Sequence, residues 1–475
     1  MLFNSLTFCL FLPLVFALYW FACGRSLRMQ NLLVVLASYV FYGWWDWRFL
    51  TLIAFTSTWS YLAGRIEACR LDRGLTPSRL LVAVSLVVNF GILAYFKYAN
   101  FFIDSAEGVL RALGFQADFP TLHIILPVGI SFYTFQALSY TIDVYYRRIE
   151  PTRDIVAFFA FISFFPQLVA GPIERATNLL PQFQKSRTFD CDAALHGLCL
   201  MCYGLFKKMV VADTLALYVD KVFAMPDLYT STTCLIGALF FTLQIYCDFS
   251  GYSDCARGVA RLFGFRLMVN FDRPYLSMSF AEFWRRWHIS LSTWFKDYVY
   301  IPLGGNRVPF PKVLRNTWIV FLLSGLWHGA SWTFVGWGAL HALFLTGGVL
   351  KRRLLPAAGN LSRSRNFLRG MFVFVGVSFA WIFFRARTFG DLGTYLRRLF
   401  SCQFPSSQMQ LCAALGPMTF VFCWIAVGLL ALSYLAPRDC AFKTPWGKAL
   451  YALFCIAAIV FLACPSGGEF IYFQF

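Results

Sequence analysis

Long apolar stretches alternate with short polar ones along the whole chain, and each stretch is apolar throughout rather than at every second position. Continuous apolar runs favour membrane-spanning helices over a barrel of alternating strands. The stretches cover residues 6–22, 32–42, 49–63, 80–95, 124–146, 155–169, 194–215, 233–246, 313–345, 371–384, 416–435 and 449–463. Several are shorter than the roughly 20 residues that cross a hydrocarbon core, so we expect some re-entrant or interfacial helices. The pattern predicts an all-α, polytopic membrane protein, a helical bundle with about 10–12 spans.

Composition and charge support this interpretation. Of the 475 residues, 59% are hydrophobic and 13% are charged, which is too little charge to cover a soluble protein of this size. The net charge of +18 comes from Lys and Arg gathered between the apolar stretches, a pattern typical of cytoplasmic loops rather than of nucleic-acid binding. Basic clusters at 65–79, 307–315 and 351–369 therefore mark cytoplasmic segments. No repeat or soluble domain interrupts the pattern, so residues 1–475 are expected to form a single domain.

The first apolar stretch, 6–22, has no basic residue before it and no small-residue cleavage site, so it is expected to be a retained span. Arg25 and Arg28 follow it and place the amino terminus on the outer side of the membrane. Most of the 15 cysteines lie in or near apolar stretches, where cysteine packs as a small hydrophobic residue. Cys199 and Cys202 are interpreted in the same way, and no metal site is predicted.

A different pattern follows between Ser279 and Tyr300, where aromatic residues recur at helical spacing. It predicts an amphipathic helix at the cytoplasmic interface, because the charged residues of this segment would be costly in the middle of a membrane. His288 lies on this helix and is expected to point from it into the protein. It is either a functional residue or a histidine whose hydrogen bonds are satisfied within an interfacial aromatic belt.

Unlike His288, His328 lies in an apolar stretch without a nearby charged residue. Arg315 marks the preceding cytoplasmic edge, and the intervening residues, at ~1.5 Å each, would place His328 about 20 Å into the membrane. Gly325 and Gly329 would allow a neighbouring backbone to approach closely or the helix to break around a cavity. A neutral imidazole at this depth suits a general base, and a histidine that hydrogen-bonds across helices for packing fits the same pattern.

The other polar residues in apolar surroundings have more ordinary explanations. The remaining histidines are interpreted as structural: His123, His196 and His341. Asp248 either stabilises the structure, as Asp254 would by pairing with Arg257 one helical turn away, or lines a cavity. Proline and glycine at 127–130 and 171–175 predict breaks in two apolar stretches, which are tolerated where they border cavities.

Five segments together resemble the membrane-bound O-acyltransferase family, specifically its bacterial branch of alginate O-acetylases and teichoic-acid D-alanyl-transfer proteins. They are residues 127–145 (PVGISFYTFQALSYTIDVY), 171–173 (GPI), 248–265 (DFSGYSDCARGVARLFGF), 283–303 (FWRRWHISLSTWFKDYVYIPL) and 327–332 (WHGASW). The resemblance implies a bundle around a central funnel and narrow tunnel, with an acyl donor on the cytoplasmic side and an acceptor on the other. It places the family's invariant histidine on His328 and its second motif histidine on His288, so both are candidate catalytic residues. The candidates for the tunnel or substrate binding are Trp287, Trp327, Trp332, Asp248 and Tyr472.

The resemblance further implies an enzyme, an O-acyltransferase of the bacterial inner membrane that passes an acetyl group from a cytoplasmic thioester for O-acetylation of an exopolysaccharide such as alginate. The donor would be acetyl-CoA or an acyl carrier protein, with no bound cofactor or metal. His328 would take the hydroxyl proton, which speeds such steps by roughly 10²- to 10⁴-fold. The expected partners are membrane lipid, extracytoplasmic acetyltransferase-like proteins and the polysaccharide, and not nucleic acid. The alternatives are acetylation of cellulose or peptidoglycan, D-alanylation of teichoic acid, or a transporter without transferase chemistry.

The chain ends in an aromatic segment, 470–475, that resembles the C-terminal ends of alginate-type members. Tyr472 is expected either to dock in the funnel or to anchor the chain end at the membrane interface. In the first case it would gate the tunnel or receive the acyl group before a partner does.

Overall fold

A computed structural model describes residues 1–115, 119–122, 124–354, 363–404, 416–435, 444–464 and 470–471. Every regular element within these ranges is a helix, which confirms the all-α class. Five helices among the described residues are long and apolar enough to cross a membrane: Arg79–Ala112, Cys191–Ala224, Ser231–Leu262, Trp332–Leu354 and Ser364–Arg385. Four shorter apolar helices accompany them: Leu6–Ala22, Ile155–Leu168, Pro417–Ser433 and Trp446–Leu462. The protein is therefore a polytopic membrane protein, and several of the twelve apolar stretches are shorter or broken helices.

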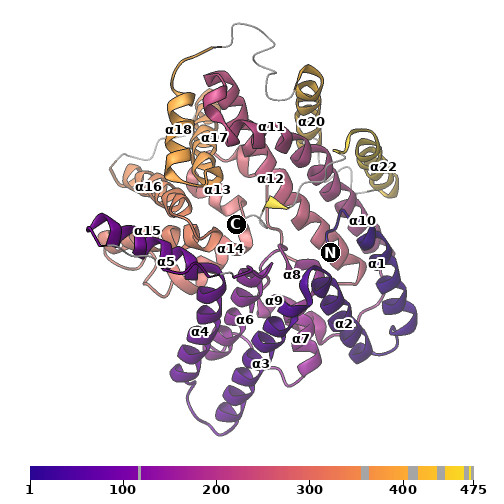
Figure 1. Ribbon diagram of the computed structural model, residues 1–475. Coiled ribbons are helices and arrows are strands. Elements are labelled where there is room, and N and C mark those ends of the chain that lie inside the picture. The colour runs from indigo at the N-terminus through magenta and orange to yellow at the C-terminus, as the bar shows by residue number, and fades with distance from the viewer. Residues whose placement is uncertain are drawn as a thin grey trace. The chain divides into compact units, whose positions relative to one another are not determined.

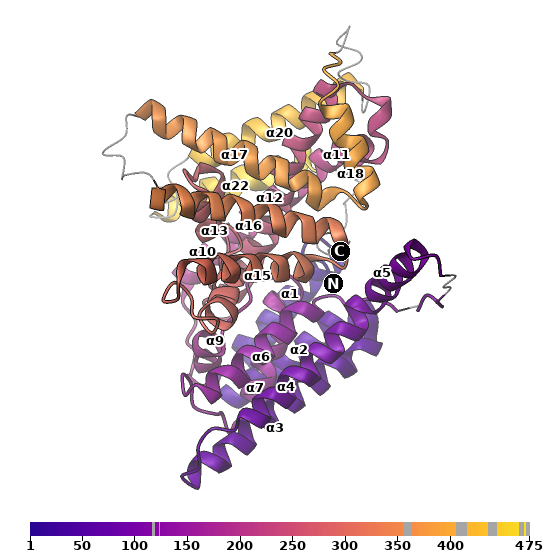
Figure 2. The same ribbon diagram turned by 90° about the vertical axis from the view of Figure 1, so that its left-hand side faces the viewer.

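The chain falls into two compact units, and the first comprises Met1–Met201 and Cys255–Met268. Its helices are α1 (Leu6–Ala17), α2 (Leu27–Asp46), α3 (Leu50–Asp72), α4 (Arg79–Leu93), α5 (Ala99–Ala112), α6 (Ile130–Tyr145), α7 (Ile155–Ser163), α8 (Phe165–Leu168), α9 (Ala176–Phe183) and most of α10 (Cys191–Leu205). Helices α2, α3, α4, α6 and α7 lie side by side in both views of the ribbon (Figure 1, Figure 2), and α3 and α4 both contact α6. Their shared core is aromatic, with Tyr133, Tyr140 and Phe158 fully buried.

Both breaks predicted in this unit are present. Helix α6 begins only after Gly129, whose φ of 76° lies in the left-handed region and whose position leaves no room for a side chain, since a Cβ would lie 2.7 Å from the Leu168 carbonyl oxygen. The segment 171–175 is non-helical and holds the fully buried Glu174. The Glu174 carboxylate accepts hydrogen bonds from the Met268 backbone N–H (2.5 Å) and from Asn178 Nδ2 (2.6 Å). Burial nevertheless raises the pKa of Glu174 to about 7, because the charged form is poorly solvated there.

The second unit comprises Cys202–Asp254 and Val269–Phe475. Its elements are η4 (Phe206–Ala212), α11 (Asp213–Ala224), most of α12 (Ser231–Leu262), α13 (Phe280–Arg286), α14 (Ile289–Phe295), η7 (Lys296–Tyr300), α15 (Phe310–His328), α16 (Trp332–Leu354), α17 (Arg363–Arg385), α18 (Phe389–Leu399), α20 (Pro417–Leu435) and α22 (Pro445–Leu462). Figure 2 shows α15, α16 and α17 side by side, and α16 contacts both neighbours. These helices carry the histidines singled out in the sequence.

Glycines bring α15 and α16 unusually close. A Cβ on Gly325 would lie 2.3 Å from the Phe334 carbonyl oxygen, and a Cβ on Gly338 would lie 2.2 Å from the Phe321 carbonyl oxygen. Only glycine admits the neighbouring backbone at such distances. The close approach expected at Gly325 is therefore confirmed, and its counterpart on α16 is Gly338.

Candidate active site

His288 lies at a sharp break between α13 and α14. The backbone of Trp287 is extended, and the φ of 42° and ψ of 55° at His288 lie in the left-handed region. The continuous amphipathic helix predicted for 279–300 is therefore wrong, since α13, α14 and the π-helical turn η7 replace it. The break buries the side chain of His288 completely.

Asn270 fixes the orientation of the His288 ring. Its side-chain oxygen Oδ1 accepts hydrogen bonds from the Ser290 backbone N–H (3.2 Å) and hydroxyl (2.9 Å), and it lies 3.1 Å from His288 Nδ1. Because a backbone N–H can only donate, Oδ1 is the acceptor and His288 Nδ1 carries the ring proton. Nε2 then has a free lone pair and no hydrogen-bond partner among the described residues. Burial lowers the pKa of His288 to about 3, so the ring is neutral at physiological pH.

His328 is the last residue of α15 and is 3% exposed. The centre of its ring lies 6.3 Å from that of His288. The expected separation of the two histidines in depth is therefore wrong. The left-handed break turns His288 inward, toward the end of α15, and the two imidazoles become neighbours.

Indole rings pack against this pair. Trp327 contacts both histidines, with ring centres 5.8 Å from His288 and 5.0 Å from His328. Trp287 is fully buried and precedes His288 in the chain. Trp332 differs, because it is 54% exposed at the start of α16. Of the three tryptophans taken from the motifs, Trp287 and Trp327 thus lie in the buried cluster and Trp332 lies outside it.

Other residues of the site were missed in the sequence. Trp337 of α16 lies 5.0 Å from His328 by ring centres, and Trp381 of α17 lies 5.8 Å from Trp337. Both are fully buried aromatic residues in apolar stretches, which sequence alone does not distinguish from ordinary core. Asn270 could have been recognised from the sequence, because a single amide side chain between Val269 and Phe271 needs a hydrogen-bond partner when it is buried.

His341 is equally buried but holds the opposite tautomer. The Trp284 indole N–H donates to His341 Nδ1 over 3.3 Å, so Nδ1 is the acceptor and Nε2 carries the proton of the neutral ring. Trp337 separates His341 from His328, with ring centres 4.9 Å and 5.0 Å away. His341 therefore has no free lone pair to act as a base, which agrees with its interpretation as structural.

Comparison with known proteins identifies the family. The model of the membrane-bound O-acyltransferase (MBOAT) family matches residues 148–386, which include both His288 and His328. The probable alginate O-acetylase AlgI of Pseudomonas putida is 38% identical over 501 aligned positions that cover 100% of both chains. The chain belongs to the membrane-bound O-acyltransferase family.

Two further relatives support this assignment. The probable alginate O-acetylase AlgI of Azotobacter vinelandii is 46% identical to this acyltransferase over 81% of the chain and 75% of its own length. The peptidoglycan O-acetyltransferase of Helicobacter pylori is 35% identical over 82% of the chain and 77% of its own length. The protein is therefore an O-acyltransferase, and its relatives act on more than one acceptor.

Asp248 of the acyltransferase is buried on α12 in a cluster of charges. Its Oδ1 lies 2.8 Å from Lys208 Nζ, and Lys208 is also 2.8 Å from Asp213 Oδ1. Asp254 pairs with the neighbouring Lys207 over 2.6 Å. Both lysines come from the π-helical turn η4, which presents them to α12 at consecutive positions. Each buried carboxylate thus has a cationic partner, as burial of charge requires.

A cavity of about 450 Å³ lies among α13, α14, η7, α15 and α16 of the acyltransferase. Its lining includes Ile289, which follows His288, and Ser324, one helical turn before His328. Three cations also line it: Arg285, Lys296 and Arg352. Because no lining residue is acidic, the cavity suits an anionic ligand.

The remaining predictions for this acyltransferase concern Tyr472 and metal binding. Tyr472, a candidate for substrate binding, lies outside the residues that the structure describes. Among the residues that the structure describes, no group of three or more His, Cys, Asp or Glu side chains is arranged to hold a metal ion.

Proposed function

We propose that this acyltransferase passes an acetyl group from a cytoplasmic thioester donor across the bacterial inner membrane for O-acetylation of an exopolysaccharide such as alginate. Relatives named as probable alginate O-acetylases, 38% and 46% identical, support this acceptor. The observation that carries the proposal is the buried pair of histidines, whose ring centres are 6.3 Å apart within the region that the family model matches.

In the proposed reaction, His328 takes the proton of the acceptor hydroxyl while the hydroxyl oxygen attacks the carbonyl carbon of the thioester. The carbon–sulfur bond then breaks, and the proton passes to the leaving thiolate. His288 is the second proton acceptor of the pair, because Asn270 holds its Nδ1 proton and leaves the Nε2 lone pair free. Trp287 and Trp327 exclude water around the reacting groups.

The cavity among α13, α14, η7, α15 and α16 is the proposed entry for the donor. Acetyl-CoA and an acyl carrier protein both present a phosphate-bearing pantetheine arm, and phosphate is attracted to Arg285, Lys296 and Arg352. Arg352 belongs to one of the basic clusters that the charge pattern assigns to the cytoplasm. The apolar part of the cavity, between Ile289 and Ser324, would hold the arm with its thioester toward the histidines.

The acceptor and the partners complete the proposal. The polysaccharide would be reached on the far side of the membrane, directly or through extracytoplasmic acetyltransferase-like proteins that finish the transfer. Peptidoglycan is the second candidate acceptor, because the Helicobacter pylori peptidoglycan O-acetyltransferase is 35% identical over 82% of the chain.

The test uses inverted membrane vesicles with ¹⁴C-labelled acetyl donor. His328→Gln and His288→Gln are each expected to lower transfer of label by at least ~10²-fold, since each removes a proton acceptor. His341→Gln is the matched control, because His341 is equally buried but has no free lone pair, and it should retain transfer within about threefold. Equal loss in all three variants would show that the pair is not the catalytic centre.

The same vesicles test donor and acceptor. Acetyl-CoA and an acetylated carrier protein are supplied in parallel, and label is counted in alginate and in peptidoglycan strands. Replacing Arg285 and Arg352 by glutamine should raise the KM for the donor about tenfold or more while kcat stays within about threefold, because the cations bind the donor and do not touch the reacting atoms. An unchanged KM would contradict the proposed entry.

A further inference from the structure

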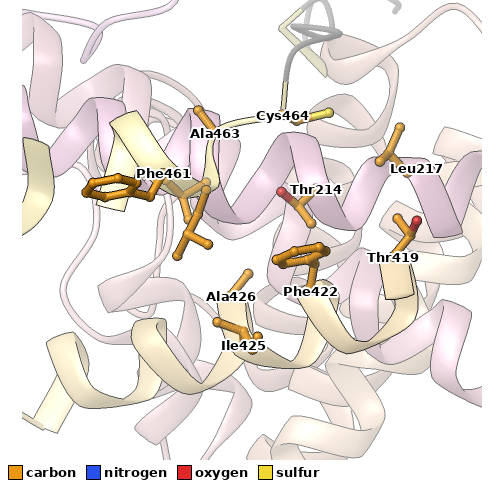
Figure 3. Close-up of a pocket in the computed structure, with 11 residues that line it drawn as sticks. Thr214, Leu217, Thr419, Phe422, Ile425, Ala426, Phe461, Ala463 and Cys464 are labelled. Carbon is orange, nitrogen blue, oxygen red and sulfur yellow. The ribbon is translucent and has the colours of Figure 1, made fainter. Parts of the chain in front are cut away.

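The end of the chain is tied to the second unit at two points. Beyond α22, the Cys464 backbone N–H donates a hydrogen bond to the Met209 carbonyl oxygen of η4 over 3.2 Å. Figure 3 shows Ala463 and Cys464 leaving the end of α22 next to Thr214 of α11, beside an apolar cavity of about 220 Å³. Further along, the Ile471 backbone N–H donates to Asp248 Oδ2 of α12 over 2.6 Å.

Asp248 is held in place as an acceptor for this bond. Lys208 Nζ lies 2.8 Å from the other carboxylate oxygen, Oδ1, and it also lies 2.8 Å from Asp213 Oδ1. The side chains of Asp248 and Asp213 are each 3% exposed, so neither oxygen of Asp248 depends on water. One oxygen faces a cation and the other faces a backbone N–H, which is the arrangement that makes a buried carboxylate tolerable.

Phe470, the residue before Ile471, packs on α12 close to His288. The Phe470 ring lies 4.9 Å from the Tyr252 ring and 6.0 Å from the Phe249 ring, both on α12. The Phe249 ring in turn packs edge-on to His288, with ring centres 4.7 Å apart. Phe470 and Ile471 are both almost fully buried. The ring of Phe249 therefore lies against both Phe470 and His288.

We propose that Asp248 is a positioning residue that anchors the C-terminal segment at Phe470–Ile471, so that this segment forms part of the wall around His288. Lys208 and Asp213 hold the Asp248 carboxylate in the required orientation. The proposal gives Asp248 a role in the reaction without contact with substrate, and it rests on the proposed acetyl transfer for its effect on activity. A tail that only anchored the chain in the membrane interface would not place these two residues in the protein interior.

The decisive measurement is hydrogen–deuterium exchange of the C-terminal peptide in the full-length protein, which needs no turnover. In Asp248→Ala the Ile471 N–H loses its acceptor, and its exchange should become at least about tenfold faster. Asp254→Ala is the matched control. It removes a carboxylate of the same helix that pairs with the neighbouring lysine, Lys207, whereas the acceptor of the Ile471 N–H is Asp248. Its C-terminal exchange should equal that of the wild type.

A second variant removes the donor instead of the acceptor. Ile471→Pro has no N–H to give to Asp248, whereas Ile471→Ala keeps the N–H and loses only side-chain packing. Ile471→Pro should lower acetyl transfer about tenfold or more at an unchanged donor KM, and Ile471→Ala should lower it much less. Adding Ile471→Pro to Asp248→Ala should bring no loss beyond that of Asp248→Ala alone, because Asp248→Ala has already removed the acceptor of this bond.

Three outcomes separate the possibilities. Unchanged exchange in Asp248→Ala, with α12 still protected, would overturn the anchor. Equal loss of transfer in Ile471→Pro and Ile471→Ala would also overturn it, because packing alone would then explain the effect. If the exchange results hold but wild-type vesicles transfer no acetyl label, the anchor stands and the proposed function fails.

Discussion

Replacing Gly338 by alanine should force apart the two helices that carry most of the site. A Cβ at Gly338 of α16 would lie 2.2 Å from the Phe321 carbonyl oxygen of α15. Non-bonded contacts are favourable only near 3.5 Å, so the helices must separate by roughly 1 Å. Overpacking of this kind costs about 1–3 kcal/mol of unfolding free energy. His328 ends α15, and a ~1 Å displacement of a catalytic group can lower a rate by ~10²-fold.

Gly347→Ala provides the control for this prediction. Gly347 lies on the same helix, α16, and a Cβ there would meet no atom within 4 Å. Alanine should therefore stabilise the helix by roughly 0.5–1 kcal/mol. The free energy of unfolding is measured by circular dichroism in mixed micelles with rising dodecyl sulfate, and acetyl transfer is measured in vesicles. The reasoning is refuted if Gly338→Ala matches Gly347→Ala in both measurements.

Three further predictions concern buried polar groups. Asn270→Ala removes the acceptor that holds Ser290 and His288, and it should lower the free energy of unfolding by about 1–3 kcal/mol and acetyl transfer by at least tenfold, with both measured as above. Burial lowers the pKa of His288 to about 3, so between pH 6.5 and 3 the unfolded chain binds a proton that the folded one does not. Lowering the pH from 7 to 5 should therefore decrease the free energy of unfolding by about 2 kcal/mol through this residue. Unfolding titrations of His288→Asn should not show this decrease. Burial raises the pKa of Glu174 from 4.5 to about 7, so the folded state holds the extra proton and stability falls as the pH rises through this range. When the pH rises from 5 to 8, Glu174→Gln should lose less free energy of unfolding than the wild type, as measured by unfolding titrations.

The helices were predictable because burial in lipid demands continuous apolar stretches, and the described residues show helices at nearly all of these positions. The close approach at Gly325 was predictable for a related reason, since only glycine permits it. The break at His288 was not predictable from periodicity. The aromatic residues of 279–300 keep helical spacing on both sides of it, and one residue in the left-handed region is enough to redirect the chain.

Contacts between polar residues far apart in the chain were also not predictable from the sequence. Asp248 carried a visible signal as a charged residue in an apolar stretch, but its partners Lys208 and Ile471 are 40 and 223 positions away in the chain. Asp254 pairs with Lys207, which lies on another helical segment and which spacing along one helix does not suggest. In a membrane protein each buried charge must find a partner, yet the sequence pattern favours local ones and the fold supplies distant ones.

The backbone of His288 links the fold to the chemistry. A residue other than glycine in the left-handed region costs about 1–3 kcal/mol, and it persists only where its surroundings fix it. Here the Ile289 N–H donates to the Asn270 carbonyl oxygen over 2.9 Å, and the Ser290 N–H donates to the Asn270 side chain over 3.2 Å. Asn270 therefore both stabilises the strained turn and selects the tautomer of the ring that the turn exposes to His328. Glycine at this position would relieve the strain but would leave Asn270 Oδ1 without the imidazole N–H and the pair without its second ring. Stability alone does not require histidine there, whereas the second proton acceptor of the proposed mechanism does.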